Sequence, residues 1–315
     1  EVGRGFKLSE RNAVYWFYLA AKQEHAAAQY KLGQYYEIGK WVAMSAQQSA
    51  YWYYQSAMLE YGLAQVSIGA CFEAGKGVEK DLDEAFYWYG KAADNKIADG
   101  QYALGRFYDK GIATEKDKKK AFELYLAAAT QNHVLAETAT GLCYKKGIGA
   151  AQSYKLAAQW FAKSAKAGDV AASNQLGLLY QAGLGVKQNY KLAYKQFAKA
   201  AAKGLADAQN NLALCFDEGK GVELNAQKSL QWYGKAAAQR HGGAQCNLAQ
   251  FYYEGRLGKP DYVESYKWCL VAKMNGVKTL PNIFVELQSV LSENEKNRCL
   301  TLAKRFTRSL KSKSD

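Results

Sequence analysis

The chain has 315 residues, of which 49% are apolar, 28 are glycine and only two are proline. This composition is typical of helices separated by turns and argues against a mainly β or disordered chain. Six cysteines are too few for a disulfide scaffold, and no apolar run reaches the roughly 18 residues of a membrane-spanning helix. The net charge of +13 leaves nucleic acid and anionic surfaces open as partners.

A pattern of small, branched and aromatic residues recurs every 36 residues and predicts the first helix of a repeating unit. Its small residue is Ala28, Ala64, Gly100, Ala136, Ala172, Ala208 or Ala244, and we count this residue as position 1. Position 5 is Leu, Ile or Thr, position 9 is Tyr or Phe, and a glycine at position 12 closes the helix. Because positions 1, 5 and 9 lie on one stripe of a helix, we expect that stripe to be buried.

The second helix of each unit is predicted from its first residue and from a tryptophan column. Its N-cap candidates are Ser9, Ser45, Asp81, Asp117, Ser153, Asn189, Asn225 and Asp261. All are residue types whose side chains accept hydrogen bonds from a helix N-terminus. The column seven residues later holds Trp16, Trp52, Trp88, Trp160, Trp232 and Trp268. We expect these tryptophans, and the aromatic residues generally, to be core residues.

These columns resemble the Sel1-like repeat, a 36-residue relative of the tetratricopeptide repeat. The ending that the family favours, Trp-Tyr-x-Lys-Ala-Ala, stands here at residues 88–93, after the loop Gly-Lys-Gly-Val at 75–78. Trp41 and Ala113 depart from the second loop glycine, and Thr140 departs from the leucine. The resemblance covers roughly residues 1–276. It implies an all-α fold, a right-handed α/α superhelix or solenoid of about eight repeats with a C-terminal helical cap.

The two ends of the chain differ from the repeats. Residues 3–6 are in register with residues 75–78, so we expect a repeat domain over 1–276 whose first repeat is truncated and lacks its first helix. Residues 277–315 are expected to form capping helices and a basic tail that ends in disorder. Ser292 to Glu295 has the spacing of a capping box. Lys304, Arg305 and Arg308 supply much of the basic charge.

No constellation of residues predicts catalysis, a metal site or a cofactor site. His25, His133 and His241 are three repeats apart and fall in equivalent turns, too far apart to share a metal or a substrate. Cys71 and its equivalents, Cys143 and Cys215, fall on the core side of the first helix, where a thiol behaves as a small apolar group. We therefore expect no enzyme and no cofactor.

The binding residues are sought at positions 3, 7 and 10 of the first helix, which point away from the buried stripe toward a predicted concave groove. Position 7 holds three consecutive leucines, and two asparagines at position 3 flank them; asparagine can both donate to and accept from a peptide backbone. The candidates are Leu142, Leu178, Leu214, Asn174, Asn210, Arg106, Tyr102 and Asp109. The alternative is that the leucines only pack against neighbouring first helices.

The resemblance implies a non-catalytic scaffold or adaptor that binds an extended peptide or a helix of a partner protein in this groove. The Lys-, Gln- and Ala-rich repeats favour a bacterial protein. The resemblance, to a family that includes exported bacterial proteins acting on host cells, then implies an exported or virulence-associated protein with a host partner. The alternative is an electrostatic binder of nucleic acid or anionic lipid, through the basic tail and the lysines near the second helices. Those lysines are Lys116, Lys118, Lys119, Lys120, Lys163, Lys199 and Lys235.

Overall fold

A computed structural model of the chain describes residues 10–311, and this part contains seventeen helices and no strand. Two compact units divide the chain, residues 1–153 and 154–315. The first unit contains α1 (Glu10–Lys22), α2 (Ala26–Ile38), α3 (Ala46–Met58), α4 (Gly62–Ala74), α5 (Leu82–Asp94), α6 (Ala98–Lys110), α7 (Lys118–Thr130) and α8 (Val134–Lys146). The second contains α9 (Tyr154–Ala167), α10 (Val170–Ala182), α11 (Tyr190–Ala202), α12 (Ala206–Glu218), α13 (Ala226–Ala238), α14 (Gly242–Tyr253), α15 (Tyr262–Met274), α16 (Ile283–Val290) and α17 (Glu293–Lys311).

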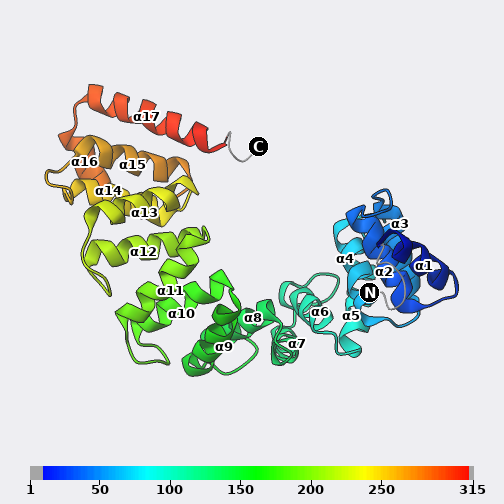
Figure 1. Cartoon of the computed structure of the whole chain (residues 1–315). Coiled ribbons are helices and arrows are strands. Elements are labelled where there is room, and N and C mark those ends of the chain that lie inside the picture. The colour runs from blue at the N-terminus through cyan, green and yellow to red at the C-terminus, as the bar shows by residue number, and fades with distance from the viewer. Residues whose placement is uncertain (1–9, 312–315) are drawn as a thin grey trace. The chain divides into compact units, whose positions relative to one another are not determined.

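Within each unit the repeat helices, α1 to α8 and α9 to α15, stack in chain order, so that neighbours in the chain pack against each other (Figure 1). The even-numbered helices α2 to α14 are the predicted first helices, and the odd-numbered helices α1 to α15 are the predicted second helices. The prediction of an all-α repeat fold is therefore confirmed. None of the helices in the described part is long and apolar enough to cross a membrane.

The helix ends are where the cap residues predict them. Asp81 Oδ1 accepts hydrogen bonds from the backbone N–H groups of Asp83 and Glu84, at 2.9 and 3.0 Å. Comparable caps form at Ser45, Asp117, Asn189, Asn225 and Asp261. Ser9, another predicted cap, lies outside the described residues. The glycines at position 12 end six first helices in the left-handed conformation, with φ between 66° and 70°.

The core follows the predicted stripe, with position 5 buried in every repeat from Leu32 to Leu248. The glycine beside it, at position 6, lies beneath a ring of the next second helix. A Cβ on Gly69 would stand 2.9 Å from the ring carbons Cδ1 and Cε1 of Tyr89, and one on Gly33 would stand 2.6 Å from Tyr53 Cδ1. These glycines therefore let two helices of one repeat approach closely.

The loop between the two helices of a repeat packs on the preceding second helix. A Cβ on Gly77, where φ is 78°, would stand 2.0 Å from the carbonyl oxygen of Ala46. Trp41 and Ala113, which replace this glycine in two repeats, keep the left-handed conformation with φ of 64° and 54°. The loop shape therefore survives both substitutions.

The expectation that aromatic residues generally lie in the core is wrong for part of the first unit. Trp52, Trp88 and Trp268 are buried, but Trp16 is exposed. Tyr15, which precedes Trp16 on α1, is exposed as well. The tryptophan that follows in the next repeat, Trp52, packs against residues of α1 and α2, so the exposure of a second-helix tryptophan depends on the repeat before it.

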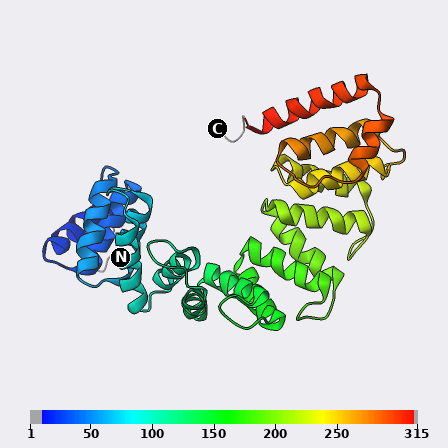
Figure 2. The ribbon, with the colours of Figure 1, turned by 180° about the vertical axis from the view of Figure 1, so that it is seen from behind.

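After α15 the repeating pattern ends, and α16 and α17 follow. Figures 1 and 2 show α17 lying along α15, where the rings of Phe306 and Trp268 stand 5.0 Å apart. The predicted capping box forms, since Glu295 Oε2 accepts from the Ser292 backbone N–H at 2.9 Å. Lys304, Arg305 and Arg308 belong to α17. The truncated first repeat and the disordered tail were predicted from residues that lie outside the described part, so both stay predictions.

Candidate functional site

The eight predicted binding residues lie on four first helices. In each unit we call the surface formed by positions 3, 7 and 10 of its first helices the first-helix face of that unit. In the first unit, α6 carries Tyr102, Arg106 and Asp109, and α8 carries Leu142. In the second unit, α10 carries Asn174 and Leu178, and α12 carries Asn210 and Leu214. Each unit is therefore described separately.

In the first unit all four predicted residues line one hollow of about 340 Å³, which we call the α6–α8 hollow. Its lining is Tyr102, Arg106, Asp109, Lys110, Lys118, Tyr125, Ala139, Leu142, Cys143, Lys146 and Ile148. Leu142 is half-buried, and the aromatic and apolar side chains stand among four cationic ones. A hollow with an apolar part and charged groups around it can take an apolar side chain of a peptide and orient its backbone.

The cationic side of the hollow is fixed by an ion pair between repeats. Arg106 Nη2 donates to Glu73 Oε1 at 2.7 Å, and the Tyr89 hydroxyl donates to Glu73 Oε2 at 2.8 Å. The equivalent carboxylate one repeat earlier, Glu37, accepts from Tyr53 at 2.7 Å and from Lys76 at 2.9 Å. Arg106 is therefore oriented by the repeat packing, which the sequence did not indicate.

The acidic residue of the hollow is also paired. Lys118 Nζ donates to Asp109 Oδ1 at 2.5 Å and to the Asp109 backbone carbonyl at 2.9 Å. Lys145 holds position 10 on α8. Burial lowers the pKa of its ammonium group most, and the positive charge of Lys146 lowers it further. The first-helix face therefore changes from carboxylates at position 10 of α2, α4 and α6 to a cation on α8.

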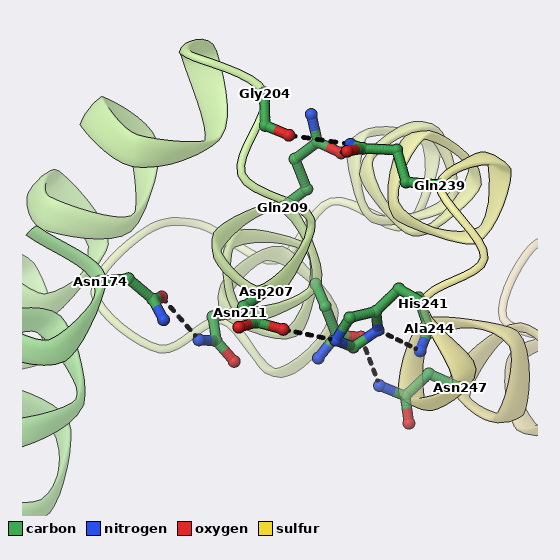
Figure 3. A network of polar contacts seen from close by, with 10 residues as sticks. Asn174, Gly204, Asp207, Gln209, Asn211, Gln239, His241, Ala244 and Asn247 are labelled. Carbon is green, nitrogen blue, oxygen red and sulfur yellow. Dashed lines mark hydrogen bonds and ion pairs between the residues drawn. The ribbon is translucent and has the colours of Figure 1, made fainter. Parts of the chain in front are cut away.

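In the second unit the predicted asparagines pair with asparagines of the next repeat. Asn211 Nδ2 donates to Asn174 Oδ1, and Asn247 Nδ2 donates to Asn210 Oδ1, both at 2.9 Å (Figure 3). Asn174 and Asn210 are only 3% and 8% exposed. Both predicted acceptors are therefore occupied by bonds that join successive first helices.

The partners, Asn211 and Asn247, were missed from the sequence although each follows a position-3 residue directly. In Figure 3 the amide oxygens of Asn211 and Asn247 point away from the bonds that their nitrogens make. Both side chains are half-exposed. The pairs therefore leave amide oxygens at a spacing of one repeat, and such oxygens can accept from peptide N–H groups.

The leucines of the second unit are half-buried and contact the core. Leu178 packs against the buried cluster that contains Phe197 and Phe216, and Leu214 packs against the cluster that contains Leu248 and Phe251. Packing against the core, the alternative considered for these leucines, therefore accounts for part of their surface. The remaining surface is open, so both stay predicted binding residues.

The histidines and three equivalent cysteines have structural surroundings. His241 Nδ1 accepts from the Ala244 backbone N–H at 2.9 Å, so Nε2 carries the proton and donates to Asp207 Oδ1 at 3.0 Å (Figure 3). His25 and His133 cap α2 and α8 through the same atom. Burial raises the pKa of Cys71, Cys143 and Cys215 to about 11. No group of His, Cys, Asp or Glu within residues 10–311 has an arrangement that could hold a metal ion.

Several lysines near the second helices lie against aromatic rings. Lys235 Nζ stands 3.9 Å from the ring centroid of Trp232, and Lys120 Nζ stands 4.3 Å from that of Tyr108. Lys118 is held by Asp109, as described above. These contacts hold the lysine side chains against the repeats and keep their positive charges at the protein surface.

The sequence profile of the Sel1 repeat matches residues 1–25, 26–61, 62–96, 98–133, 134–169, 170–205, 206–241 and 243–277. A search of curated proteins finds no match. A solved Sel1 repeat protein from Oxalobacter formigenes is 32% identical with a TM-score of 0.69, and the match covers 80% of this chain and 99% of that one. A protective antigen of uropathogenic Escherichia coli strains, described as displaying an SLR fold, is 24% identical over 97% of this chain and 89% of that one. Its TM-score is 0.56, and this likeness concerns the fold alone.

Proposed function

The chain belongs to the Sel1 repeat family, and from this we propose that it is a non-catalytic scaffold that binds a segment of a partner protein on its first-helix face. Sel1 repeat proteins are generally protein-interaction scaffolds. Repeat proteins of this kind present extended surfaces built from equivalent positions of successive units.

The observation that supports the proposal is the α6–α8 hollow. The repeat positions in the sequence predict Tyr102, Arg106, Asp109 and Leu142 as binding residues, and all four line this one hollow. An apolar side chain of the partner would enter beside Leu142, while Arg106 and the Asp109–Lys118 pair would orient polar groups around it. In the second unit, Leu178 and Leu214 with the asparagine pairs offer a comparable apolar and amide surface.

The test compares two leucines of α8. Leu142→Asp places a charge in the hollow, whereas Leu135→Asp changes a residue of the same helix that is 51% exposed and outside the hollow lining. Peptides selected from a displayed random library on the native chain are then titrated against both variants. We expect Leu142→Asp to weaken their binding by about ten- to hundredfold, since burying a leucine contributes about 1.5–3 kcal/mol.

The control Leu135→Asp should bind as the native chain does, and circular dichroism should show equal helicity for both variants. Equal affinity of Leu142→Asp and the native chain for every selected peptide would contradict the proposal for this hollow. The same comparison with Leu178→Asp and Leu214→Asp addresses the second unit, with melting curves to separate lost binding from lost packing.

We extend the proposal to an exported bacterial protein that acts on a host partner. The Lys-, Gln- and Ala-rich repeats and the 32% identity to a bacterial Sel1 repeat protein support a bacterial origin. Fractionation of cells that express the protein naturally should recover it in the envelope or the medium. Recovery in the cytosol alone would contradict export.

The charge distribution favours a second candidate, an electrostatic binder of nucleic acid or anionic lipid. Residues 98–315 contain 32 Lys and Arg against 18 Asp and Glu. Binding of single-stranded DNA, RNA or anionic vesicles should then fall steeply as salt rises. Absence of binding at low salt would remove this candidate.

A further inference from the structure

Three exposed tyrosines form a stripe on the second helices of the first unit. Tyr15, Tyr51 and Tyr87 hold the same position of α1, α3 and α5, at intervals of 36 residues, and are 59%, 51% and 51% exposed. We call these three residues the tyrosine stripe. The same position in the other second helices holds Glu123, Gln159, Lys195, Gln231 and Lys267. The fold therefore does not require an aromatic residue here, and polar residues serve in five of eight repeats.

Each ring of the stripe is held in place by a neighbouring tryptophan. Tyr51 meets the ring of Trp52 edge to face, with centroids 5.0 Å apart, and Tyr87 meets Trp88 in the same way at 5.1 Å. Trp52 and Trp88 are themselves buried, whereas Trp16, whose ring centroid lies 5.6 Å from that of Tyr15, is exposed. Tyr51 and Tyr87 therefore lose little side-chain freedom when a ligand covers them, which favours binding.

The surroundings of the stripe carry charges of both signs and no excess of positive charge. On α3, helix geometry places Gln47, Gln48, Gln55 and the exposed Tyr54 beside Tyr51, because residues three and four apart are neighbours. On α5 the same geometry places Asp83 and Glu84 beside Tyr87, and the ammonium group of Lys91 lies 5.6 Å from the ring centroid of Tyr87. Residues 10–97, which form these three repeats, contain eight Lys and Arg against ten Asp and Glu, in contrast to the basic remainder of the chain.

This charge decides between ligands that stack on aromatic rings. Surfaces that stack nucleic-acid bases combine the rings with a strongly basic surface, which residues 10–97 lack. Proline-rich peptides dock in aromatic-lined grooves, whereas each tyrosine of the stripe stands open with more than half of its surface exposed. A repetitive ligand that has flat apolar faces and needs no basic surface is an uncharged chain of pyranose sugars. Its C–H faces stack on rings, and its hydroxyl groups bond to amides such as those of Gln47 and Gln48.

We propose that the tyrosine stripe binds an extended neutral polysaccharide, with successive tyrosines stacking on sugar rings and the glutamines of α3 bonding to hydroxyl groups. The regular spacing of the tyrosines by one repeat suits a polymer with its own regular repeat. This site is on the second helices, so it is separate from the first-helix face that the proposed function uses.

The test uses the full chain and four uncharged probes, the hexasaccharides of the cello-, chito-, xylo- and malto- series, in titration calorimetry. The variant Tyr15→Gln/Tyr51→Gln/Tyr87→Gln removes the stripe, and the chain already tolerates glutamine at this position in Gln159 and Gln231. We expect at least one probe to bind the native chain and to bind the variant at least about tenfold more weakly. Because no charge is involved, the affinity should not change with salt.

The control is Tyr262→Gln, which changes a 39% exposed tyrosine of α15 in the second unit and should leave binding unchanged. Absence of binding of all four probes to the native chain would overturn the proposal, as would equal binding by the triple variant. The proposal would also be overturned if the native chain bound itself or a proline-rich peptide and the triple variant did not. The stripe would then be a protein-binding surface. Leu142→Asp should leave sugar binding intact, so failure here and failure of the proposed function are distinguishable.

Discussion

The close approach of two helices within a repeat can be tested by replacing each of two glycines of the same repeat, separately, with alanine. Gly69 lies in α4 beneath Tyr89, and Gly90 follows Tyr89 on α5. An added Cβ would meet the Tyr89 ring at 2.9 Å in the first case and nothing within 4 Å in the second. Gly69→Ala and Gly90→Ala should therefore change stability in opposite directions.

The magnitudes follow from two opposing effects. Alanine is favoured over glycine inside a helix by about 1 kcal/mol, and this gain applies to both variants. Overpacking a filled core costs about 1–3 kcal/mol, and it applies only to Gly69→Ala. We expect Gly90→Ala to raise the free energy of unfolding by about 0.5–1 kcal/mol and Gly69→Ala to lower it by about 1 kcal/mol.

The chain contains a natural version of the crowded case. Ala213 stands where the five preceding repeats have glycine, with Tyr233 of α13 in the place of Tyr89. The Tyr233 hydroxyl lies 3.4 Å from Asp217 Oδ2, whereas the Tyr89 hydroxyl lies 2.8 Å from Glu73. Aspartate is one methylene shorter than glutamate, which accounts for the longer distance. Ala213 and Tyr233 share one buried cluster, so the fold can accommodate a methyl group in this position, and this limits the expected cost of Gly69→Ala.

Thermal unfolding followed by circular dichroism measures both variants, and hydrogen exchange of the α4 and α5 amides checks that the change is local. A change of 1 kcal/mol corresponds to about 2–4 °C in a unit of this size. Melting temperatures that move in the same direction for both variants would refute the reasoning, because the ring contact would then not decide the sign.

Two further predictions concern backbone strain and pH. Lys96 holds φ of 57° in a turn where three other repeats have glycine, so Lys96→Gly should stabilise the chain by about 0.5 kcal/mol in thermal melts, and Gly204→Ala in the equivalent turn should destabilise it by about 1 kcal/mol. Hydrogen bonds from Lys76 and Tyr53 lower the pKa of Glu37, so the stability that Glu37 contributes is present above its unfolded pKa and is lost as pH falls. Burial raises the pKa of Asp217, so the stability that Asp217 contributes is present below its unfolded pKa and is lost as pH rises. Between about pH 7 and 3, the melting temperature of Glu37→Gln should therefore fall less on acidification than that of the native chain. The melting temperature of Asp217→Asn should fall less than the native one when pH rises over the same range. Native-like dependence of the melting temperature on pH in both variants would contradict these assignments.

The sequence predicts most of the fold because each repeat has the same local environment. Position 5 is buried from Leu32 to Leu248. It belongs to a stripe on one side of the helix whose residue types recur in every repeat, and this recurrence is what the sequence shows. Caps such as Asp81 are equally local, since they require only the N–H groups of the following turn. The caps need no neighbouring repeat, and the stripe needs only that a neighbouring repeat covers it, as the residues of the preceding repeat do for Leu32 and Leu248.

What the sequence did not predict are contacts between repeats. Arg106 pairs with Glu73, which lies 33 residues earlier, and Asn174 with Asn211, which lies 37 residues later. Such pairs depend on the rotation between neighbouring repeats, which no position within one repeat indicates. Trp16 shows the same dependence, because Trp52 is buried against the helices before it and Trp16 is exposed at the same position.

A repeat protein allows fold and function to be separated by comparing columns of equivalent residues. Each unit contacts mainly its neighbours, so a residue type that the packing requires must return in nearly every unit, as the small residue at position 1 does from Ala28 to Ala244. The tyrosine stripe behaves differently, since it holds three consecutive repeats and then gives way to polar residues at the same exposed position. The leucines at 142, 178 and 214 also form a run of three that the other repeats do not share. A packing requirement common to all units does not account for runs that stop, and this is the reason for proposing a binding role for both runs, on different helices of the repeat.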